Sequence, residues 1–353
     1  MKKLQNSLYI LTQGAYLTKE GETIAVYVDR ELKQRFPIHN QSNILCFGNV
    51  LCTPALMGMC GENGVGMSFF TENGRFLARV NGPVSGNVLL RRKQYRAADD
   101  VNIRAELARW MVVAKIANSR KNLLRAVREY PGKDGAARLK DASDYLAATL
   151  KNLELFKPLE VVRGIEGDAA RVYFSVFDEL IVAQKDKFFF HGRNRRPPMD
   201  NVNAMLSFVY TLIAHDVSSA LEGVGLDPAV GFLHADRPGR PSLALDLMEE
   251  FRSMVGDRLV LTLINRKQVR NDGFQKTETG GVIMNDKTRK EIIKNYQERK
   301  RDEIMHPFIN EKISLGLLPH VQAMLLSSCL RGDIDGYPHF IGNDRDEVLP
   351  CFF

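Results

Sequence analysis

The sequence predicts an α+β protein in which a small N-terminal β-sandwich is followed by a larger all-α domain. Apolar and polar residues alternate with a period of two along the first 85 residues, which is typical of half-buried strands. Turn-forming residues then interrupt the chain, and beyond residue 100 apolar residues recur with helical spacing. The length of 353 residues also favours two domains.

The alternation is clearest in three segments, at residues 8–12, 24–28 and 76–80. Asn73-Gly74 stands just before the third segment, and both residues tolerate the positive φ of a hairpin turn. We expect one short helix over residues 54–62. Several short strands at this spacing indicate a sandwich.

The stretch from Asn81-Gly82-Pro83 to Gly86 is rich in turn-forming residues and predicts a domain boundary. We therefore assign residues 1–85 to the sandwich, 86–100 to a linker and 101–353 to the helical domain.

The composition is that of a globular protein with a basic balance, because 49 Lys and Arg outnumber 42 Asp and Glu and give a net charge of +7. A positive balance favours polyanionic partners such as DNA.

No segment approaches the roughly 20 uncharged apolar residues of a membrane span, and the start lacks the pattern of a signal peptide. We expect a cytoplasmic protein with no membrane partner. Five cysteines without a CxxC pair favour buried, reduced thiols.

Two stretches concentrate the positive charge. Residues 103–133 hold eight basic and two acidic side chains, which are typical either of solvated helix faces or of a surface that follows phosphates. Residues 185–196 hold Arg193, Arg195 and Arg196 just before a double proline. A helix is expected to begin near Asp200, a good N-cap, so this loop is either a DNA contact or a surface loop anchored by its three phenylalanines.

Acidic residues and a histidine mark three further segments. Glu166 stands among small residues at what we predict to be a helix start. His234 ends an apolar run and precedes a turn that contains proline. Asp246 and Glu249 are three residues apart and would share one face of a helix.

These residue types suit metal-dependent chemistry on phosphodiesters. Carboxylate oxygens and one imidazole are compatible with Mg²⁺ or Mn²⁺, and such an ion stabilises the attacking and leaving oxygens of a phosphoryl transfer. The attacker could be water or a DNA 3′-hydroxyl. A lone histidine is more often a core residue, however, and a DxxE pair is more often a solvated helix face. Spacing alone does not bring Glu166 to the other two segments.

The motifs around these residues, taken in order, resemble those of the CRISPR-associated integrase, the catalytic subunit of the spacer-acquisition complex. They are Gly164-Ile165-Glu166-Gly167, Arg196-Pro197-Pro198-x-Asp200, Gly231-Phe232-Leu233-His234 and Leu245-Asp246-Leu247-Met248-Glu249-x-Phe251-Arg252. The resemblance covers nearly the whole chain, and the N-terminal run is most similar to the subtype I-C branch.

The resemblance implies a sandwich that forms homodimers and a helical catalytic domain. It also implies a small companion protein, whose dimer bridges two dimers of the integrase. The family's metal ligands carry over to Glu166, His234 and Asp246, with Mg²⁺ or Mn²⁺ as cofactor, and a second acidic position maps to Glu249.

The implied reaction inserts short foreign DNA fragments into a CRISPR repeat array by 3′-hydroxyl attack. A branched-DNA repair nuclease that uses water and a non-catalytic DNA-binding scaffold remain as alternatives. The basic loop and the family pattern together predict seven DNA contacts, namely Tyr210, Arg193, Arg195, Arg196, Arg237, Arg240 and Arg252.

Overall fold

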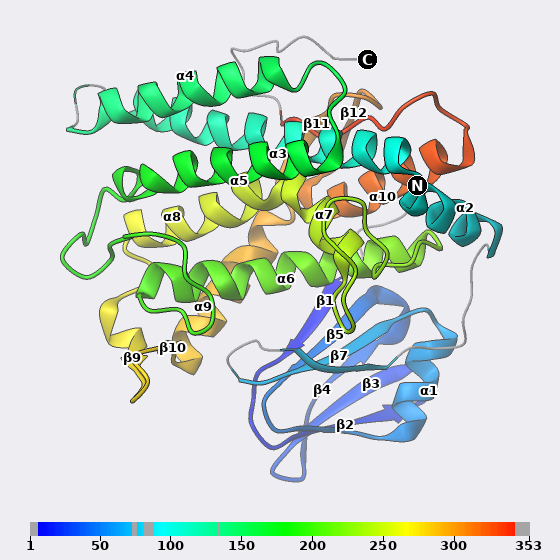
Figure 1. Cartoon of the computed structure of the whole chain (residues 1–353). Helices are drawn as coiled ribbons and strands as arrows, with labels where there is room; N and C mark the ends of the chain where they lie inside the picture. The colour runs from blue at the N-terminus through cyan, green and yellow to red at the C-terminus, as the bar shows by residue number, and fades with distance from the viewer. Residues whose placement is uncertain (1–5, 73–75, 81–87, 131, 133, 343–353) are drawn as a thin grey trace. The chain divides into compact units, whose positions relative to one another are not determined.

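The computed structural model describes residues 6–72, 76–80, 88–130, 132 and 134–342. The chain divides into two compact units, residues 1–86 and 87–353 (Figure 1). The first holds two β-sheets and the second is mainly helical, which confirms the predicted α+β class.

The first unit is a sandwich of two four-stranded sheets, with strand orders β1-β5-β7-β8 and β4-β3-β2-β6. Strand β5 pairs in parallel with both β1 and β7, while β7 and β8 are antiparallel. The turn predicted at Asn73-Gly74 lies outside the described residues. The strands are β1 (Asn6–Ile10), β2 (Ala15–Glu20), β3 (Thr23–Val28), β4 (Glu31–Pro37), β5 (Gln41–Phe47), β6 (Val50–Cys52), β7 (Gly66–Phe70) and β8 (Phe76–Val80).

Side chains from both sheets fill the sandwich core, where Leu17, Ile24, Ile44 and Met67 are fully buried. The predicted short helix is α1 (Pro54–Glu62), and it adds its own apolar side chains to this core. Proline at its first position and the hydroxyl of the preceding threonine, which accepts a backbone hydrogen bond, start this helix. Four cysteines lie in the described residues and all are free thiols, as predicted, but only Cys46 and Cys60 are buried, whereas Cys52 and Cys329 are partly exposed.

The predicted linker over residues 86–100 is wrong for most of its length, because helix α2 (Val88–Asp99) occupies it. Its sequence is rich in Leu, Arg, Lys, Gln and Ala, which are strong helix formers. Asp100 ends α2 and caps α3 (Val101–Glu129) by accepting from the N–H groups of Asn102 and Ile103, both at 2.9 Å. The turn-rich boundary at 81–86 lies outside the described residues.

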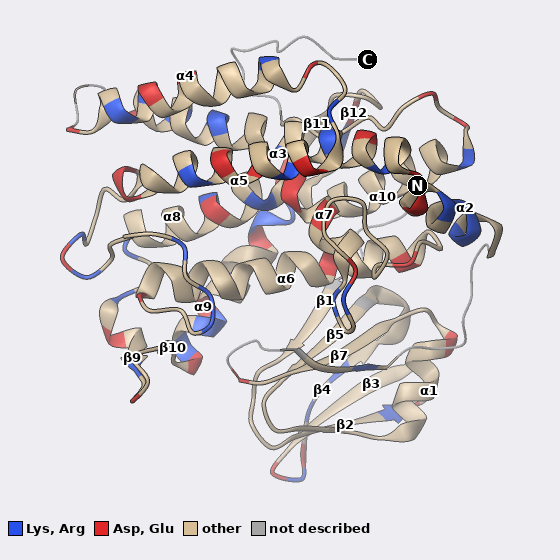
Figure 2. Cartoon of the chain, in the orientation of Figure 1, with Lys and Arg blue, Asp and Glu red and all other residues tan. Residues whose placement is uncertain are grey.

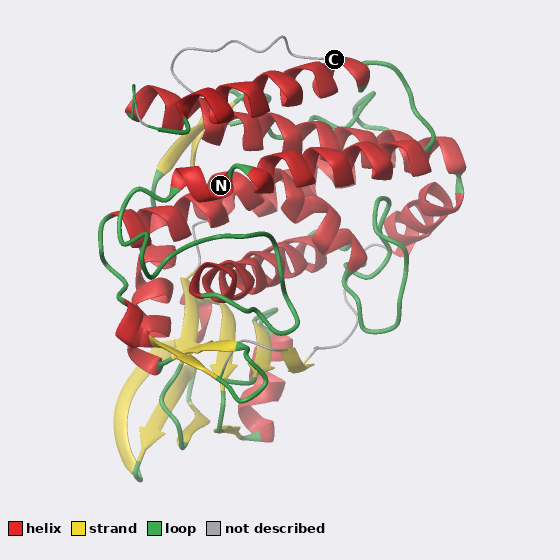
Figure 3. Ribbon diagram, turned by 60° about the vertical axis from the view of Figure 1, so that its left-hand side comes forward, coloured by secondary structure: helices red, strands yellow, loops and turns green. Residues whose placement is uncertain are grey.

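The second unit is mainly helical (Figure 3), and helices α2, α4, α5 and α7 pack against the long helix α3. Two two-stranded sheets, β10-β9 and β11-β12, lie among these helices. The unit was predicted to be all-α, and these strands correct that prediction. The remaining elements are α4 (Ala136–Asn152), α5 (Leu159–Ser175), α6 (Asn201–Gly223), α7 (Ser242–Phe251), α8 (Arg258–Asn265), β9 (Phe274–Lys276), β10 (Val282–Met284), α9 (Asp286–Arg299), β11 (Glu303–His306), β12 (Glu311–Ser314) and α10 (Leu318–Arg331).

Helix α6 begins where the sequence predicts, with the side chain of Asp200 accepting from the N–H of Asn203. By length and composition α6 could cross a membrane, but 72% of its apolar window is buried within the protein. Burial of that extent is typical of a core helix.

The basic run over residues 103–133 lies largely on α3. It matches neither prediction in full, because some of its basic side chains are neither exposed to solvent nor available to DNA phosphates. Arg109, Lys115 and Lys121 are buried, with exposed fractions of 4%, 9% and 4%. Figure 2 shows Lys, Arg, Asp and Glu intermixed along the helices of this unit. Part of the positive charge therefore serves internal ion pairs and hydrogen bonds rather than a partner.

Candidate metal centre

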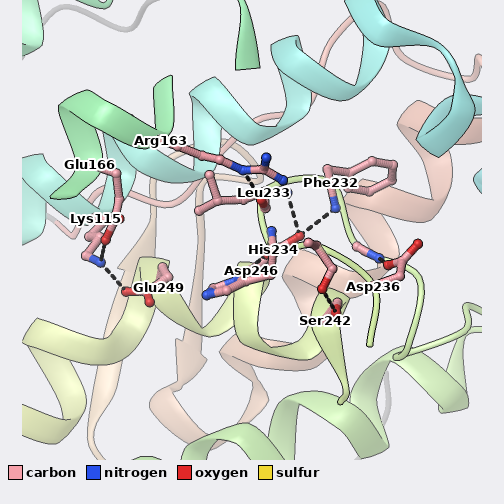
Figure 4. Close-up of polar contacts among 12 residues, drawn as sticks. Lys115, Arg163, Glu166, Phe232, Leu233, His234, Asp236, Ser242, Asp246 and Glu249 are labelled. Carbon is pink, nitrogen blue, oxygen red and sulfur yellow. Dashed lines mark hydrogen bonds and ion pairs between the residues drawn. The ribbon is translucent and has the colours of Figure 1, made fainter. Parts of the chain in front are cut away.

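Asp246 on α7 is fully buried, although its DxxE pattern alone would favour a solvated helix face. Its carboxylate accepts hydrogen bonds from the backbone N–H groups of Phe232 (2.6 Å), Leu233 (2.9 Å) and His234 (2.9 Å). A charged group is tolerated in the interior only with donors of this kind. The bonds hold the loop over residues 231–241 against α7 (Figure 4).

Gly231 opens this loop at a position with no room for a side chain. A Cβ atom there would lie 2.7 Å from Oδ2 of Asp246 and 2.8 Å from the carbonyl carbon of Ser242. The glycine therefore lets the loop approach α7 closely enough for the three N–H groups to reach the carboxylate.

His234 is oriented by the same carboxylate, with Nδ1 2.6 Å from Oδ1 of Asp246. A carboxylate only accepts, so Nδ1 carries the proton and the lone pair of a neutral ring lies on Nε2. Arg163 on α5 donates from Nε to the carbonyl of Leu233 at 2.8 Å and fixes the loop from its other side. The imidazole, one quarter exposed, is thus prepared to offer Nε2 to a metal.

Glu166 and Glu249 meet at the ammonium of Lys115. Nζ of Lys115 pairs with Oε1 of Glu166 and lies 2.9 Å from Oε2 of Glu249. Glu249 also accepts from Arg252 at 3.0 and 3.2 Å. Burial raises the pKa of Glu249, but Arg252, Lys115 and His234 outweigh burial and lower the pKa to about 2. Glu249 is therefore ionised at neutral pH.

The surroundings of Glu166 and Asp246 differ from those expected from the sequence. Glu166 lies in the middle of α5, not at a helix start, because that helix already begins at Leu159. Asp246 is fully buried, and its two oxygens accept from three backbone N–H groups and lie against the imidazole of His234. Among the described residues, no three His, Cys, Asp or Glu side chains stand close enough to hold a metal as they are placed. The cation between Glu166 and Glu249 is Lys115, and two carboxylates beside an oriented imidazole fit Mg²⁺ or Mn²⁺.

Glu250 is the third buried carboxyl of α7, and its partners among the described residues are all neutral. It accepts from the hydroxyl of Tyr337 (2.6 Å), the amide of Gln322 (2.9 Å) and the N–H of Phe340 (2.8 Å). Burial raises the pKa of Glu250 to about 8, although these hydrogen bonds offset part of the effect.

Tyr210 and Arg252 lie inside the protein, with exposed fractions of 9% and 7%. The guanidinium of Arg252 lies 4.4 Å from the ring centre of Tyr210, whose hydroxyl donates to Asp257. A π-helical segment, Arg252–Asp257, follows α7 directly and carries both Arg252 and Asp257. Neither Tyr210 nor Arg252 is placed to contact DNA, contrary to the prediction, since both are enclosed by these contacts.

Arg193 also turns inward, and the expected DNA contact is not met there either. Its guanidinium donates to Oδ1 of Asn203 (2.6 Å) and to Oγ of Ser207 (3.1 Å) on α6. It lies 5.3 Å from the ring of Tyr210. Arg193 thus anchors the loop, which the phenylalanines alone were expected to do.

The other four predicted DNA contacts are arginines from the two loops that precede α6 and α7. Three are exposed and Arg240 is partly buried. Burial lowers the pKa of Arg240, and the positive charges of Arg237, Arg195 and Arg196 lower it further, while the carboxylate of Asp246 opposes them. No ion pair joins them to any part of the chain that the structure describes. We call the set of Arg195, Arg196, Arg237 and Arg240 the arginine cluster.

Lys115 is the residue at this site that sequence reasoning missed, since it was counted within a basic run. A usable indication was present: Lys115 stands alone within the apolar stretch Trp110-Met111-Val112-Val113-Ala114-Lys115-Ile116. A lysine in such surroundings is buried, and a buried lysine requires a negative partner.

Comparison with known proteins gives one consistent result. The family model of CRISPR associated protein Cas1 matches residues 8–298. The chain is 55% identical over 341 residues to CRISPR-associated endonuclease Cas1 1 of Chlorobaculum tepidum, covering 97% of this chain and 99% of that one. It is 47% identical over 343 residues to CRISPR-associated endonuclease Cas1 2 of Rhodospirillum rubrum, covering 96% and 98%.

Solved structures agree with this. A Cas1 protein from Thermotoga maritima superposes with a TM-score of 0.78 at 26% identity, covering 93% of this chain and 97% of that one. A casposase bound to its integration product has a TM-score of 0.82 at 22% identity, covering 98% and 96%, which is a likeness in fold.

We expect Asp246→Ala to lower the free energy of unfolding by about 3–5 kcal/mol, because it leaves buried N–H groups and His234 without their acceptor. Glu166→Gln should lower it by no more than about 1 kcal/mol, because Glu166 is partly exposed and the amide still accepts from Lys115. Urea unfolding of the two variants measures this. Equal losses would contradict the structural role of Asp246.

The raised pKa of Glu250 predicts a pH-dependent stability. Folded Glu250 keeps its proton up to about pH 8, whereas the unfolded chain loses it near 4.5, so the contribution of Glu250 to stability falls as pH rises between these values. Glu250→Gln mimics the protonated form and should lose less stability than the parent between about pH 5 and about pH 8. Urea unfolding across this range tests it, with the exposed Glu298→Gln as control. Parallel profiles for Glu250→Gln and the parent would reject the prediction.

Proposed function

The chain belongs to the Cas1 family of CRISPR-associated proteins, which confirms the resemblance seen in its motifs, and from this we propose that it is a metal-dependent DNA integrase and endonuclease. It would insert short foreign DNA fragments into a CRISPR repeat array through attack of a 3′-hydroxyl on a phosphodiester. The observation that carries this proposal is the convergence of two carboxylates on one cation beside an oriented histidine.

We assign the metal to Glu166, Glu249 and Nε2 of His234, with Asp246 as the residue that positions His234. This revises the ligand set expected from the family pattern, in which Asp246 was a ligand and Glu249 the additional position. Bound Mg²⁺ or Mn²⁺ would polarise the scissile phosphate and stabilise the charge on the attacking and leaving oxygens.

The residues of the chain divide the remaining work. Asp246 keeps the proton of His234 on Nδ1, and Arg252 keeps Glu249 ionised. The arginine cluster lies on the loops that precede α6 and α7, so it can hold DNA phosphates next to the site. Such contacts position the duplex without reading its bases.

The proposed partners are the duplex spacer precursor, the repeat array and the small companion protein, all in the cytoplasm. The names of similar proteins support the first two, since they include endonucleases and a casposase bound to an integration product. Support for the companion comes from a complex titled Cas6-RT-Cas1--Cas2, whose likeness to this chain is one of fold.

We also propose that the chain forms a homodimer through the sandwich. An apolar row crosses β4, β3, β2 and β6 in register and consists of Leu32, Tyr27, Tyr16 and Leu51. Leu32, Tyr16 and Leu51 are 37%, 42% and 62% exposed, so the row offers apolar area to a second copy. Light scattering should give the mass of two copies, and Leu51→Lys should shift it towards one. A single-copy mass for the unaltered chain would reject the dimer.

Two alternative functions remain: one uses the same metal chemistry, and the other involves no reaction. A branched-DNA repair nuclease would use the same ligands with water as the attacker. A non-catalytic scaffold would only bind DNA. The intact set of acidic residues and histidine favours an enzyme over the scaffold.

Joining of DNA decides between these functions. The protein, with and without the companion, is incubated with a short 3′-hydroxyl duplex and a supercoiled plasmid that carries a repeat, in Mn²⁺ or Mg²⁺. We expect covalent joining that disappears with chelator, with Glu166→Ala and with a 3′-deoxy duplex. Nicking without joining would favour the nuclease, and binding without reaction in either metal would favour the scaffold.

The arginine cluster should account for part of the DNA affinity. Replacing Arg237 and Arg240 with alanine should weaken duplex binding and reduce the slope of log K against log salt by about 0.9 for each phosphate that is no longer neutralised. Fluorescence anisotropy over a salt series measures both quantities. Lys140→Ala on α4, an exposed residue paired with Asp144, is the control and should leave them unchanged. An unaltered slope in the double variant would remove the cluster from the interface.

A further inference from the structure

The ammonium of Lys115 occupies the point where Glu166 and Glu249 converge. It pairs with both carboxylates, and the side chains of Lys115, Glu166 and Glu249 are only 11%, 26% and 8% exposed. Burial of a lysine is costly unless its charge is compensated, so these ion pairs are what keeps it there. The amine thus takes the place that two carboxylates would give to a divalent cation (Figure 4).

Neither carboxylate depends on Lys115 alone. Arg252 reaches both oxygens of Glu249, at 3.0 and 3.2 Å, and would remain beside it if the amine moved. Glu166 is partly exposed and keeps access to water. Departure of the amine would therefore leave no buried charge without a partner, provided that another cation took its place.

A small cavity beside Lys115 offers its ammonium group a second position. Lys115 lines a cavity of about 20 Å³, which Ser253 and Asp257 also line. The hydroxyl of Ser253 is buried and has no hydrogen-bond partner among the residues that the structure describes. The volume is that of about one water molecule, which is also the size of an ammonium group. The cavity thus offers the hydroxyl of Ser253 as an acceptor. Its lining also includes Arg252 and the carboxyl group of Asp257, which accepts from Tyr173 and Tyr210.

We propose that Lys115 is a built-in competitor for the metal. It holds Glu166 and Glu249 together while no metal is bound, and a divalent cation displaces its ammonium towards Ser253. The inference rests on the metal site of the proposed function and adds that Lys115 sets the metal concentration at which the site fills.

The test is direct measurement of metal binding to the full chain by calorimetric titration with Mn²⁺. Lys115→Met removes the competing charge and should bind Mn²⁺ about tenfold more tightly than the parent, because a positive charge within ion-pair distance of the site is removed. Lys121→Met is the matched control. Lys121 is a buried lysine on the same helix that donates to the carbonyl of Gly342, and its replacement should leave Mn²⁺ affinity unchanged.

A second variant keeps the test valid if Lys115→Met does not fold. Ser253→Ala removes the receiving hydroxyl and should weaken Mn²⁺ binding by about threefold, a difference of under one kcal/mol. Unchanged affinity in Ser253→Ala would reject the cavity as the destination of the amine.

The outcomes separate the two proposals. If the parent binds Mn²⁺ and Lys115→Met binds it equally or more weakly, the displacement is overturned while the metal site stands. If the parent binds no Mn²⁺, the metal site of the proposed function fails, and the displacement fails with it.

Discussion

Helix α7 buries three carboxyl groups within five residues, and much of the second unit is arranged to compensate them. Asp246, Glu249 and Glu250 are 0%, 6% and 0% exposed. Each is satisfied by a different part of the chain: the loop before the helix, two cations from α3 and the π-helical segment, and neutral donors from α10 and the segment that follows it. A buried carboxylate without such partners would cost several kcal/mol, so these contacts fix the elements around α7.

The two neighbouring glutamates show how partner type decides charge. Both are buried to a similar degree, yet the pKa of Glu249 falls to about 2 while that of Glu250 rises to about 8. Cations face Glu249 and stabilise its ionised form. Hydroxyl and amide groups face Glu250, and they offset only part of the desolvation. Glu249 is thereby kept ionised, and Glu250 holds the segment that carries Tyr337 and Phe340.

The arginines of the site divide in the same way between interior and surface. Arg193 and Arg252 lie against the ring of Tyr210, and this stack joins the loop before α6 to Glu249. The arginine cluster on the same loop and on the loop before α7 faces outward. Residues two positions apart in sequence, Arg193 and Arg195, therefore serve positioning and DNA contact respectively under the proposed function.

The sequence by itself determined the fold class, the sandwich, α1, the start of α6 and the family, because these follow from local periodicity, capping and ordered motifs. It also identified Glu166, His234, Asp246 and Glu249 as the acidic and histidine group. Tertiary structure decided which of them meet, that Lys115 stands between two of them, and which arginines turn inward. The predicted linker proved to be helix α2, whose residues are strong helix formers, so the error lay in extending the turn-rich boundary beyond residue 86. Roles of this kind depend on burial and on contacts between residues far apart in the chain, and spacing along the sequence records neither.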